Sequence, residues 1–192
     1  MLKDLVLKNR SCRCYDRTRA VTREELLEFV DLARCTASSA NTQPLKYHIA
    51  CEPSETARIQ ELTGWAAALP QLKLPRPGTE PVAFIVICLD TDIASNETAF
   101  LRDVGIAAQT MLLAATEKGL GGCMIGNFKK EALHELLRLP GSIVPNLVVA
   151  FGKPAEQIVL TQTGPDGSTR YYRDETGTVH YVPKRSLKDV LI

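Results

Sequence analysis

The sequence has almost no surplus charge and no long hydrophobic run. Its 192 residues include 23 basic and 22 acidic side chains, which gives a formal net charge of +1 at pH 7. This balance argues against a general nucleic-acid or membrane surface, so any anion site must be local. The longest apolar runs, such as residues 82–89, are too short to span a bilayer, and the polar start Leu2-Lys3-Asp4 does not resemble a secretory signal. We therefore expect a soluble cytoplasmic protein with neither a nucleic-acid nor a membrane partner.

The sequence also lacks motifs for metal binding and for side-chain catalysis. Its three histidines are scattered, and the one close pair of cysteines, Cys12 and Cys14, is not a CxxC. We predict no metal, and we interpret the six cysteines as small buried thiols rather than disulfides. There is no Ser/His/Asp set, no glycosidase-like pair of carboxylates and no P-loop. If the chain is an enzyme, a cofactor is expected to carry the chemistry while the protein holds and tunes it.

The hydrophobic pattern, with 45% apolar residues, predicts one α+β domain that spans residues 1–192. Helices are expected at 2–8, from Thr22 to near Ala37, at 55–62, at 99–118 and at 129–137, and strands at 45–51, 82–89 and 143–151. Residues 158–182 alternate around two turn signals, which predicts a short antiparallel excursion. The helix at 99–118 is apolar on all sides, so we expect it at the centre of the fold or at a subunit interface.

Two polar segments in the first quarter of the chain are candidate binding sites. Arg10-Ser11-Cys12-Arg13 places two guanidinium groups around a hydroxyl, which suits a phosphate or a carbonyl group; a solvated basic turn is the alternative. Ser38-Ser39-Ala40-Asn41-Thr42-Gln43-Pro44 lies between a predicted helix and a predicted strand. Its side chains either bond the local backbone or present donors and acceptors to a ligand.

Three later segments are also candidates. Gly119-Leu120-Gly121-Gly122-Cys123-Met124-Ile125-Gly126 follows a helix, which disfavours a dinucleotide fingerprint. We interpret it as a helix C-cap followed by backbone that lies against a flat ligand. The basic pair Lys184-Arg185 is either solvated or binds an anion. Residues 65–79 are rich in Pro and Gly and are expected to form an exposed loop or lid, in which Trp65 either covers a ligand or packs in the core or a dimer interface.

Taken in order, these segments resemble the motifs of the nitroreductase superfamily. Its members begin with an Arg-Ser-x-Arg-x-aromatic run, here residues 10–15, and continue with a Ser-Ser-x-Asn-x-Gln-Pro loop, here residues 38–44. A long Ala-rich helix then leads to a Gly-Leu-Gly motif, here residues 119–121, and an Ile-Gly pair, here residues 125–126. A short basic segment, here Lys184-Arg185, lies near the C-terminus. The match covers nearly the whole chain, and the stretches NRSCRCY, SSANTQPLKY and VPKRSL are similar to a small, poorly characterised subgroup.

The resemblance implies an α+β fold with a central, mainly antiparallel sheet flanked by helices, in an intertwined homodimer with two FMN sites at its interface. The cofactor-binding residues that it implies are Arg10, Ser11 and Arg13 for the phosphate, ribityl chain and pyrimidine edge, Ser38, Ser39 and Asn41 from the other subunit, Ile125 and Gly126 beside the isoalloxazine ring, and Lys184 and Arg185 for the phosphate. Arg13 is expected to stabilise the anionic reduced flavin.

The activity that the resemblance implies is ping-pong electron transfer. NADH or NADPH reduces the flavin and leaves, and a small acceptor such as a nitroaromatic or a quinone takes its place. The alternatives are a flavin store or sensor without efficient turnover, and another flavin chemistry such as dehalogenation, ring cleavage or ene reduction. The chain departs from the family at Asn9, where many members are basic, at Ala37, which replaces the usual proline, and between residues 53 and 81, where it is short.

Overall fold

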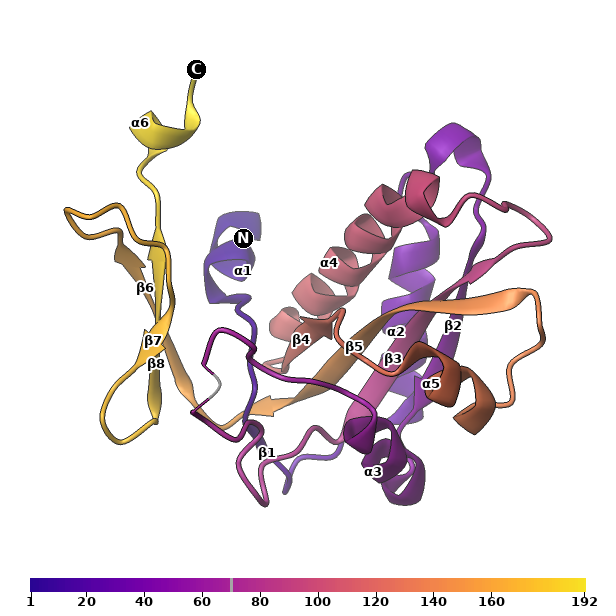
Figure 1. Ribbon diagram of the computed structural model, residues 1–192, viewed down its shortest axis with the longest axis horizontal. Coiled ribbons are helices and arrows are strands. Elements are labelled where there is room, and N and C mark those ends of the chain that lie inside the picture. Colours follow the sequence, from indigo (N-terminus) through magenta and orange to yellow (C-terminus); the bar gives the residue numbers. More distant parts are fainter. Residues whose placement is uncertain (70) are drawn as a thin grey trace.

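The computed structural model describes residues 1–69 and 71–192 (Figure 1). A central sheet contains β1 (Tyr15–Asp16), β2 (Leu45–Ala50), β3 (Ala83–Asp90), β4 (Gly121–Ile125) and β5 (Ile143–Pro154). The strand order is β1-β5-β3-β2, and β4 pairs with β5 as well. These pairings are antiparallel, which confirms the predicted α+β class and the mainly antiparallel sheet.

Strand β3 is the centre of the hydrophobic core because helices cover both faces of the sheet. Ile85 and Ile87 pack in one buried cluster with α2 (Arg23–Arg34) and α4 (Leu101–Glu117). Phe84 and Val86 pack in the other, with residues of α3 (Pro53–Glu61) and α5 (Lys130–Leu136). A strand buried on both faces reads as a continuous apolar run rather than an alternating one, which explains the sequence of residues 83–89.

The helices begin and end close to their predicted positions. Thr22 caps α2 through a reciprocal capping box with Glu25, as the sequence predicts. The predicted helix at 99–118 is a short turn η2 (Glu97–Phe100) followed by α4. One side of α4 packs on α2 and the sheet, while its other side exposes Leu101, Gly105 and Ile106. The terminal helices α1 (Leu2–Lys8) and α6 (Leu187–Val190) have no buried residues.

A second sheet of three strands lies on the α1 side of the molecule, at the left in Figure 1. It consists of β6 (Gln157–Gln162), β7 (Tyr172–Arg173) and β8 (Val179–Lys184), in the order β6-β8-β7. Only β7 and β8 are antiparallel; β6 and β8 are parallel, so the predicted antiparallel excursion over 158–182 is wrong in part. Each turn reverses the chain, so the third strand runs in the direction of the first, and it pairs with both earlier strands. Alternation along one strand does not specify its neighbours.

The cysteines are free, but they are not all buried. Cys12, Cys14, Cys88 and Cys123 are buried, whereas Cys51 is half-buried and Cys35 is exposed. The buried-thiol interpretation is therefore wrong for Cys35, which forms the C-cap of α2, where the chain leaves the core. Over residues 1–69 and 71–192 we find no helix long and apolar enough to cross a membrane, and no group of three or more His, Cys, Asp or Glu side chains placed to hold a metal.

Candidate functional site

The segment after α1 is anchored to the last turns of α4 by Asn9. Its side chain is buried, and Nδ2 donates to the carbonyl oxygen of Leu112 (3.1 Å) and to Thr116 Oγ1 (3.0 Å). Asn9 Oδ1 accepts a hydrogen bond from Gln109 Nε2 (3.1 Å). The side-chain amide of Asn9 donates and accepts hydrogen bonds at the same time in this position. A basic side chain could not replace it, because it has no acceptor. Asn9 therefore has a structural role, and the sequence alone gave no reason to expect it.

The same segment lies against the start of β4 because Gly122 has no side chain. Cys12 N donates to the carbonyl oxygen of Gly122 (2.9 Å), and Ser11 forms a bridge with Gly122. A Cβ atom on Gly122 would lie 2.3 Å from the carbonyl oxygen of Ala150 and 2.5 Å from Leu112 Cδ2. The glycine-rich stretch thus allows three backbone segments to pack closely.

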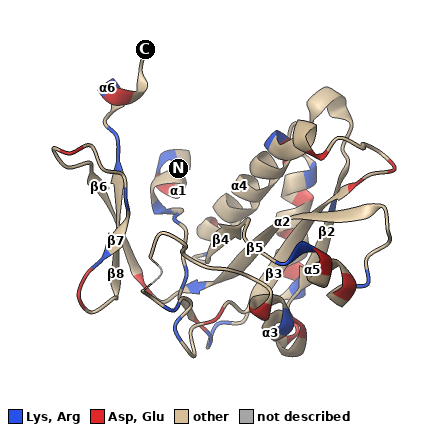
Figure 2. Cartoon of the chain, viewed as in Figure 1, with Lys and Arg blue, Asp and Glu red and all other residues tan. Residues whose placement is uncertain are grey.

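A cavity of about 270 Å³ opens between this segment and one face of β8. Its lining residues are Arg10, Ser11, Arg13 and Lys184, together with Asn9, Tyr171, His180 and Val182. Residues 180, 182 and 184 share one face of the strand because side chains alternate along β8. Figure 2 shows basic residues on the segment after α1 and at the end of β8. None of the described lining residues is acidic, so the three cations and the Ser11 hydroxyl fit an anionic group such as a phosphate monoester.

Arg13 is fixed by contacts with the C-terminal sheet. Its guanidinium lies over the ring of Tyr171, 5.1 Å from the ring centroid, and Nη1 donates to the carbonyl oxygen of Ser11 (3.4 Å). Its backbone N–H donates to the carboxylate of Glu156, which also pairs with Arg173. The side chains of Glu156 and Arg173 are 0% and 3% exposed, so this ion pair ties the small sheet to the wall of the cavity.

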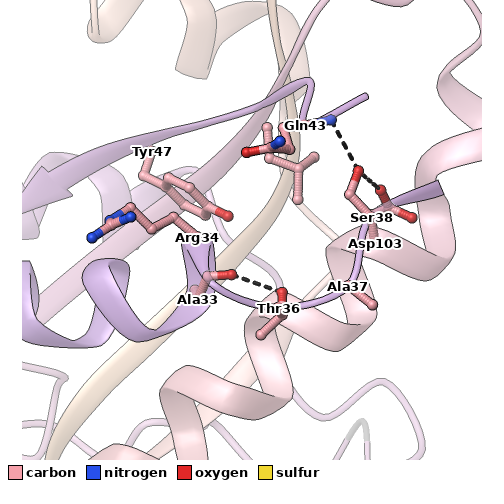
Figure 3. A pocket seen from close by; sticks show the side chains of 9 residues that line it. Ala33, Arg34, Thr36, Ala37, Ser38, Gln43, Tyr47 and Asp103 are labelled. Atoms are coloured by element: carbon pink, nitrogen blue, oxygen red, sulfur yellow. Dashed lines mark hydrogen bonds between the residues drawn. The ribbon is translucent and has the colours of Figure 1, made fainter. Parts of the chain in front are cut away.

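The second polar segment lies at the other end of α4 and is organised by a buried carboxylate (Figure 3). Asp103 is 3% exposed and accepts hydrogen bonds from Ser38 Oγ (2.6 Å), Ser39 N (3.0 Å) and Ser39 Oγ (3.0 Å). Gln43 N donates to Ser38 Oγ (3.0 Å), which closes the loop. Both serine hydroxyls therefore bond within this chain, but they donate to a side chain far along the sequence rather than to the local backbone.

This loop also has an unusual backbone. Ala40, Asn41 and Gln43 have φ values of 51°, 55° and 52°, in the left-handed region. Non-glycine residues held there cost about 1–3 kcal/mol each and cluster at functional sites. The loop borders a smaller cavity of about 120 Å³ that is also lined by Arg34 and Tyr47, and burial raises the pKa of Tyr47 to about 12. Asn41 is exposed, so its side chain is accessible to a ligand or to a second chain.

Strand β4 ends at Ile125 and Gly126, which present backbone rather than side chains. Ile125 is buried, whereas Gly126 is exposed and has no described heavy atom within 4 Å of its would-be Cβ position. The backbone here is open to a flat ligand. Trp65, for which two roles were predicted, packs partly buried against the second core cluster, and its Nε1 donates to Thr63 Oγ1 (2.9 Å).

The structure thus brings together some of the predicted residues and separates others. Arg10, Ser11, Arg13 and Lys184 share the cavity, while Arg185 is exposed and does not line it. The 38–41 loop bonds Asp103 near the start of α4, whereas Asn9 bonds Thr116 near its end. Those two positions of α4 are separated by about 20 Å, at 1.5 Å per residue. Tyr171, His180 and Asp103 were not predicted as site residues; an aspartate within an apolar helix was the one available signal.

The chain belongs to the nitroreductase family. The family model described as Nitroreductase family matches residues 6–153, so the small C-terminal sheet lies outside the match. A provisionally named NADH dehydrogenase/NAD(P)H nitroreductase of Methanothermobacter thermautotrophicus is 27% identical over 157 residues, which cover 80% of this chain and 77% of that protein. An FMN reductase (NADPH) of Bacillus subtilis is 26% identical over 173 residues, covering 79% of this chain and 65% of that protein. A nitroreductase family protein from Streptococcus pneumoniae has the same fold, with a TM-score of 0.71 at 18% identity over 86% of this chain and 96% of that one.

Proposed function

We propose that the protein is an FMN-dependent NAD(P)H oxidoreductase that acts as a homodimer. Family membership supports the class, and the names of the two relatives include NAD(P)H nitroreductase and FMN reductase (NADPH). The observation that carries the proposal is the cavity that Arg10, Arg13 and Lys184 line together, without an acidic residue among its described lining residues. A chain with formal net charge +1 concentrates cations here, which favours a phosphate-bearing cofactor.

The residues of the cavity fit the FMN phosphate, and their roles follow from their chemistry. Arg10 and Lys184 supply charge, and Ser11 supplies a hydroxyl donor. The backbone at Ile125 and Gly126, at the far end of β4, is the proposed platform for the flat ring. When bound, the flavin supplies the redox chemistry that this chain's side chains lack. Arg13 is the proposed cation beside the ring, where a fixed positive charge favours the reduced, anionic form.

A homodimer accounts for the residues that one chain keeps apart. The 38–41 loop and the 9–13 segment contact opposite ends of α4, so Ser38, Ser39 and Asn41 do not join this chain's own cavity. A two-fold axis across the middle of α4 would place the loop of one chain beside the cavity of the other. The outer face of α4 suits such a contact, because Leu101 and Ile106 are 51% and 41% exposed and Gly105 permits close approach.

The proposed cycle is ping-pong. NADH or NADPH would reduce the bound flavin and leave, and a small acceptor such as a nitroaromatic or a quinone would then take its place; this chain's residues would hold the cofactor and admit both substrates in turn. The principal alternative is a flavin store or sensor that binds FMN without efficient turnover. Neither function requires a catalytic acid or base from the protein, and the sequence predicts none. A measurement of turnover is therefore needed to separate the two functions.

The purified protein tests both functions in one experiment. We expect bound FMN with its flavin absorbance, rapid bleaching by NADH or NADPH without oxygen, and reoxidation by a nitroaromatic or a quinone. Flavin that does not bleach would favour the store, and a protein that takes up no FMN would refute both. Arg13→Ala is expected to weaken FMN retention and to slow bleaching. Arg17→Ala is the matched control, since Arg17 is an exposed arginine of the same region that pairs with Glu80 outside the cavity.

A further inference from the structure

The imidazole of His180 is buried in the wall of the cavity without a hydrogen-bond partner. The residue is 2% exposed, and neither Nδ1 nor Nε2 has a partner among the described residues. Its ring lies edge-on to Tyr171, with centroids 5.2 Å apart, so aromatic packing holds its orientation. Buried polar side chains of native proteins are nearly always hydrogen-bonded, so an unpaired one beside a cavity indicates a partner that enters the cavity.

Most of the charges that surround His180 are positive. Arg13 and Arg10 face the cavity from the segment after α1, and Lys184 faces it from the same strand as His180. Arg173 lies directly across the β7–β8 pair from His180, with its Nε also unpartnered among the described residues, and Glu156 is paired with Arg173. Burial, together with the charges of Arg13 and Arg173, lowers the pKa of His180 to about 4. The imidazole is therefore neutral at pH 7 in the ligand-free protein.

We propose that His180 is a direct phosphate-binding residue, and that a phosphate monoester dianion in this cavity makes its imidazole take up a proton from solvent. At neutral charge the ring donates one N–H to a phosphate oxygen; as imidazolium it donates from both nitrogens. The dianion supplies negative charge that offsets Arg13 and Arg173 and stabilises the imidazolium, which burial and those two charges disfavour in the ligand-free protein. The inference rests on the proposed function when FMN is the source of the phosphate, and on the cavity alone when the source is inorganic phosphate.

The assignment gives the small C-terminal sheet a function. Strand β8 contributes His180, Val182 and Lys184 to one wall, while the segment after α1 forms the other, and the family match stops at residue 153. The sheet therefore completes the phosphate end of the cavity in this chain. Binding should also select for the phosphate: FMN should depend on His180, whereas riboflavin, which lacks the phosphate, should not.

Two measurements test the assignment. In the first, the ring resonances of the three histidines are titrated by NMR in the full chain, alone and with FMN or with inorganic phosphate. His180→Gln identifies the His180 signal, and His48 and His134, which do not line the cavity, serve as internal references. We expect the pKa of His180 alone to rise when either ligand binds.

In the second measurement, the dissociation constants of FMN and riboflavin are determined for the wild type, His180→Gln and the control His134→Gln at pH 6 and pH 8. Because binding is accompanied by proton uptake at His180, the FMN affinity of the wild type, relative to that of His180→Gln, should rise about tenfold between pH 8 and pH 6. Comparing the two proteins at one pH cancels the titration of the phosphate itself. For riboflavin, the ratio of the wild-type affinity to the His180→Gln affinity should not change with pH. The control His134→Gln should bind FMN as the wild type does.

The outcomes separate this inference from the proposed function. FMN binding with an unchanged His180 titration, and a wild-type-to-variant ratio that is flat with pH, would overturn the His180 assignment and leave the flavin proposal standing. A shift with inorganic phosphate and no FMN binding would support the phosphate contact and refute the flavin proposal. If His180→Gln fails to fold, the wild-type titration still decides, because a signal that responds to neither ligand would refute the contact.

Discussion

Replacement of Asp103 by asparagine tests how the 38–43 loop is held. The carboxylate accepts hydrogen bonds from the Ser38 hydroxyl and from the backbone and hydroxyl of Ser39, within 2.6–3.0 Å. Asp103→Asn keeps the shape, but it removes the charge and turns one acceptor into a donor that faces another donor. Charge-assisted hydrogen bonds contribute about 1.5–3 kcal/mol and neutral ones about 0.5–1.5, so we expect the free energy of unfolding to fall by about 2 kcal/mol.

Urea unfolding monitored by circular dichroism measures this change, and Asp31→Asn is the matched control. Asp31 pairs with Arg34 on the exposed face of α2, with both side chains more than 60% exposed, and its replacement should cost at most about 0.5 kcal/mol. Asp103→Asn should also weaken FMN binding, because the left-handed backbone around Asn41 loses its anchor, while phosphate binding in the cationic cavity is unchanged. Equal stabilities of the two variants, together with wild-type FMN affinity, would refute this account of the loop.

Three further predictions concern stability. The pKa of His180 is about 4 in the folded protein and about 6.5 in the unfolded chain, so the unfolded chain binds more protons between these pH values. His180 therefore leaves the free energy of unfolding unchanged above pH 6.5 and lowers it by up to about 3 kcal/mol as the pH drops to 4. Urea titrations of His180→Phe should lack this dependence on pH. Glu156→Gln leaves Arg173 buried without its counter-charge and should lower the free energy of unfolding by about 3 kcal/mol. A decrease of only about 1 kcal/mol would contradict the buried ion pair. Gly122→Ala places a Cβ 2.3 Å from a carbonyl oxygen and should lower the melting temperature by several degrees, whereas Gly141→Ala, with open space at its Cβ, should not; equal melting temperatures would contradict the packing.

The fold was largely predictable because its local signals agree with its packing. A capping box begins α2, and the continuous apolar run of β3 reflects helices on both faces of the sheet. The parallel pairing of β6 with β8 was not predictable, because strand alternation carries no information on partners far along the chain. Exposure of Cys35 depends on where α2 ends relative to the core, which composition does not specify.

The candidate site was predictable where its residues are close in sequence. Arg10, Ser11 and Arg13 fall within four positions, and Lys184 joins them from the basic pair Lys184-Arg185 near the other end of the chain. The contacts that shape the site are distant in sequence: Asp103 bonds Ser38 across 65 residues, and Asn9 bonds Thr116 across 107. The sequence around His180 does not indicate a binding role for it. That role follows from the position of His180 beside Arg13 and Arg173 in the folded chain.

The central claim is a flavin site assembled from two chains, and a mixed dimer tests it most directly. Arg13→Ala removes a cation of the cavity, and Asn41→Gly removes a side chain of the loop while keeping the left-handed backbone accessible. Each variant alone should bind FMN poorly, because both of its sites carry one damaged half. A differently tagged heterodimer of the two variants has one intact site and one doubly damaged site, so we predict about one tightly bound FMN per dimer. A heterodimer that binds no more FMN than its parents, or a chain that is monomeric and retains FMN, would contradict the account.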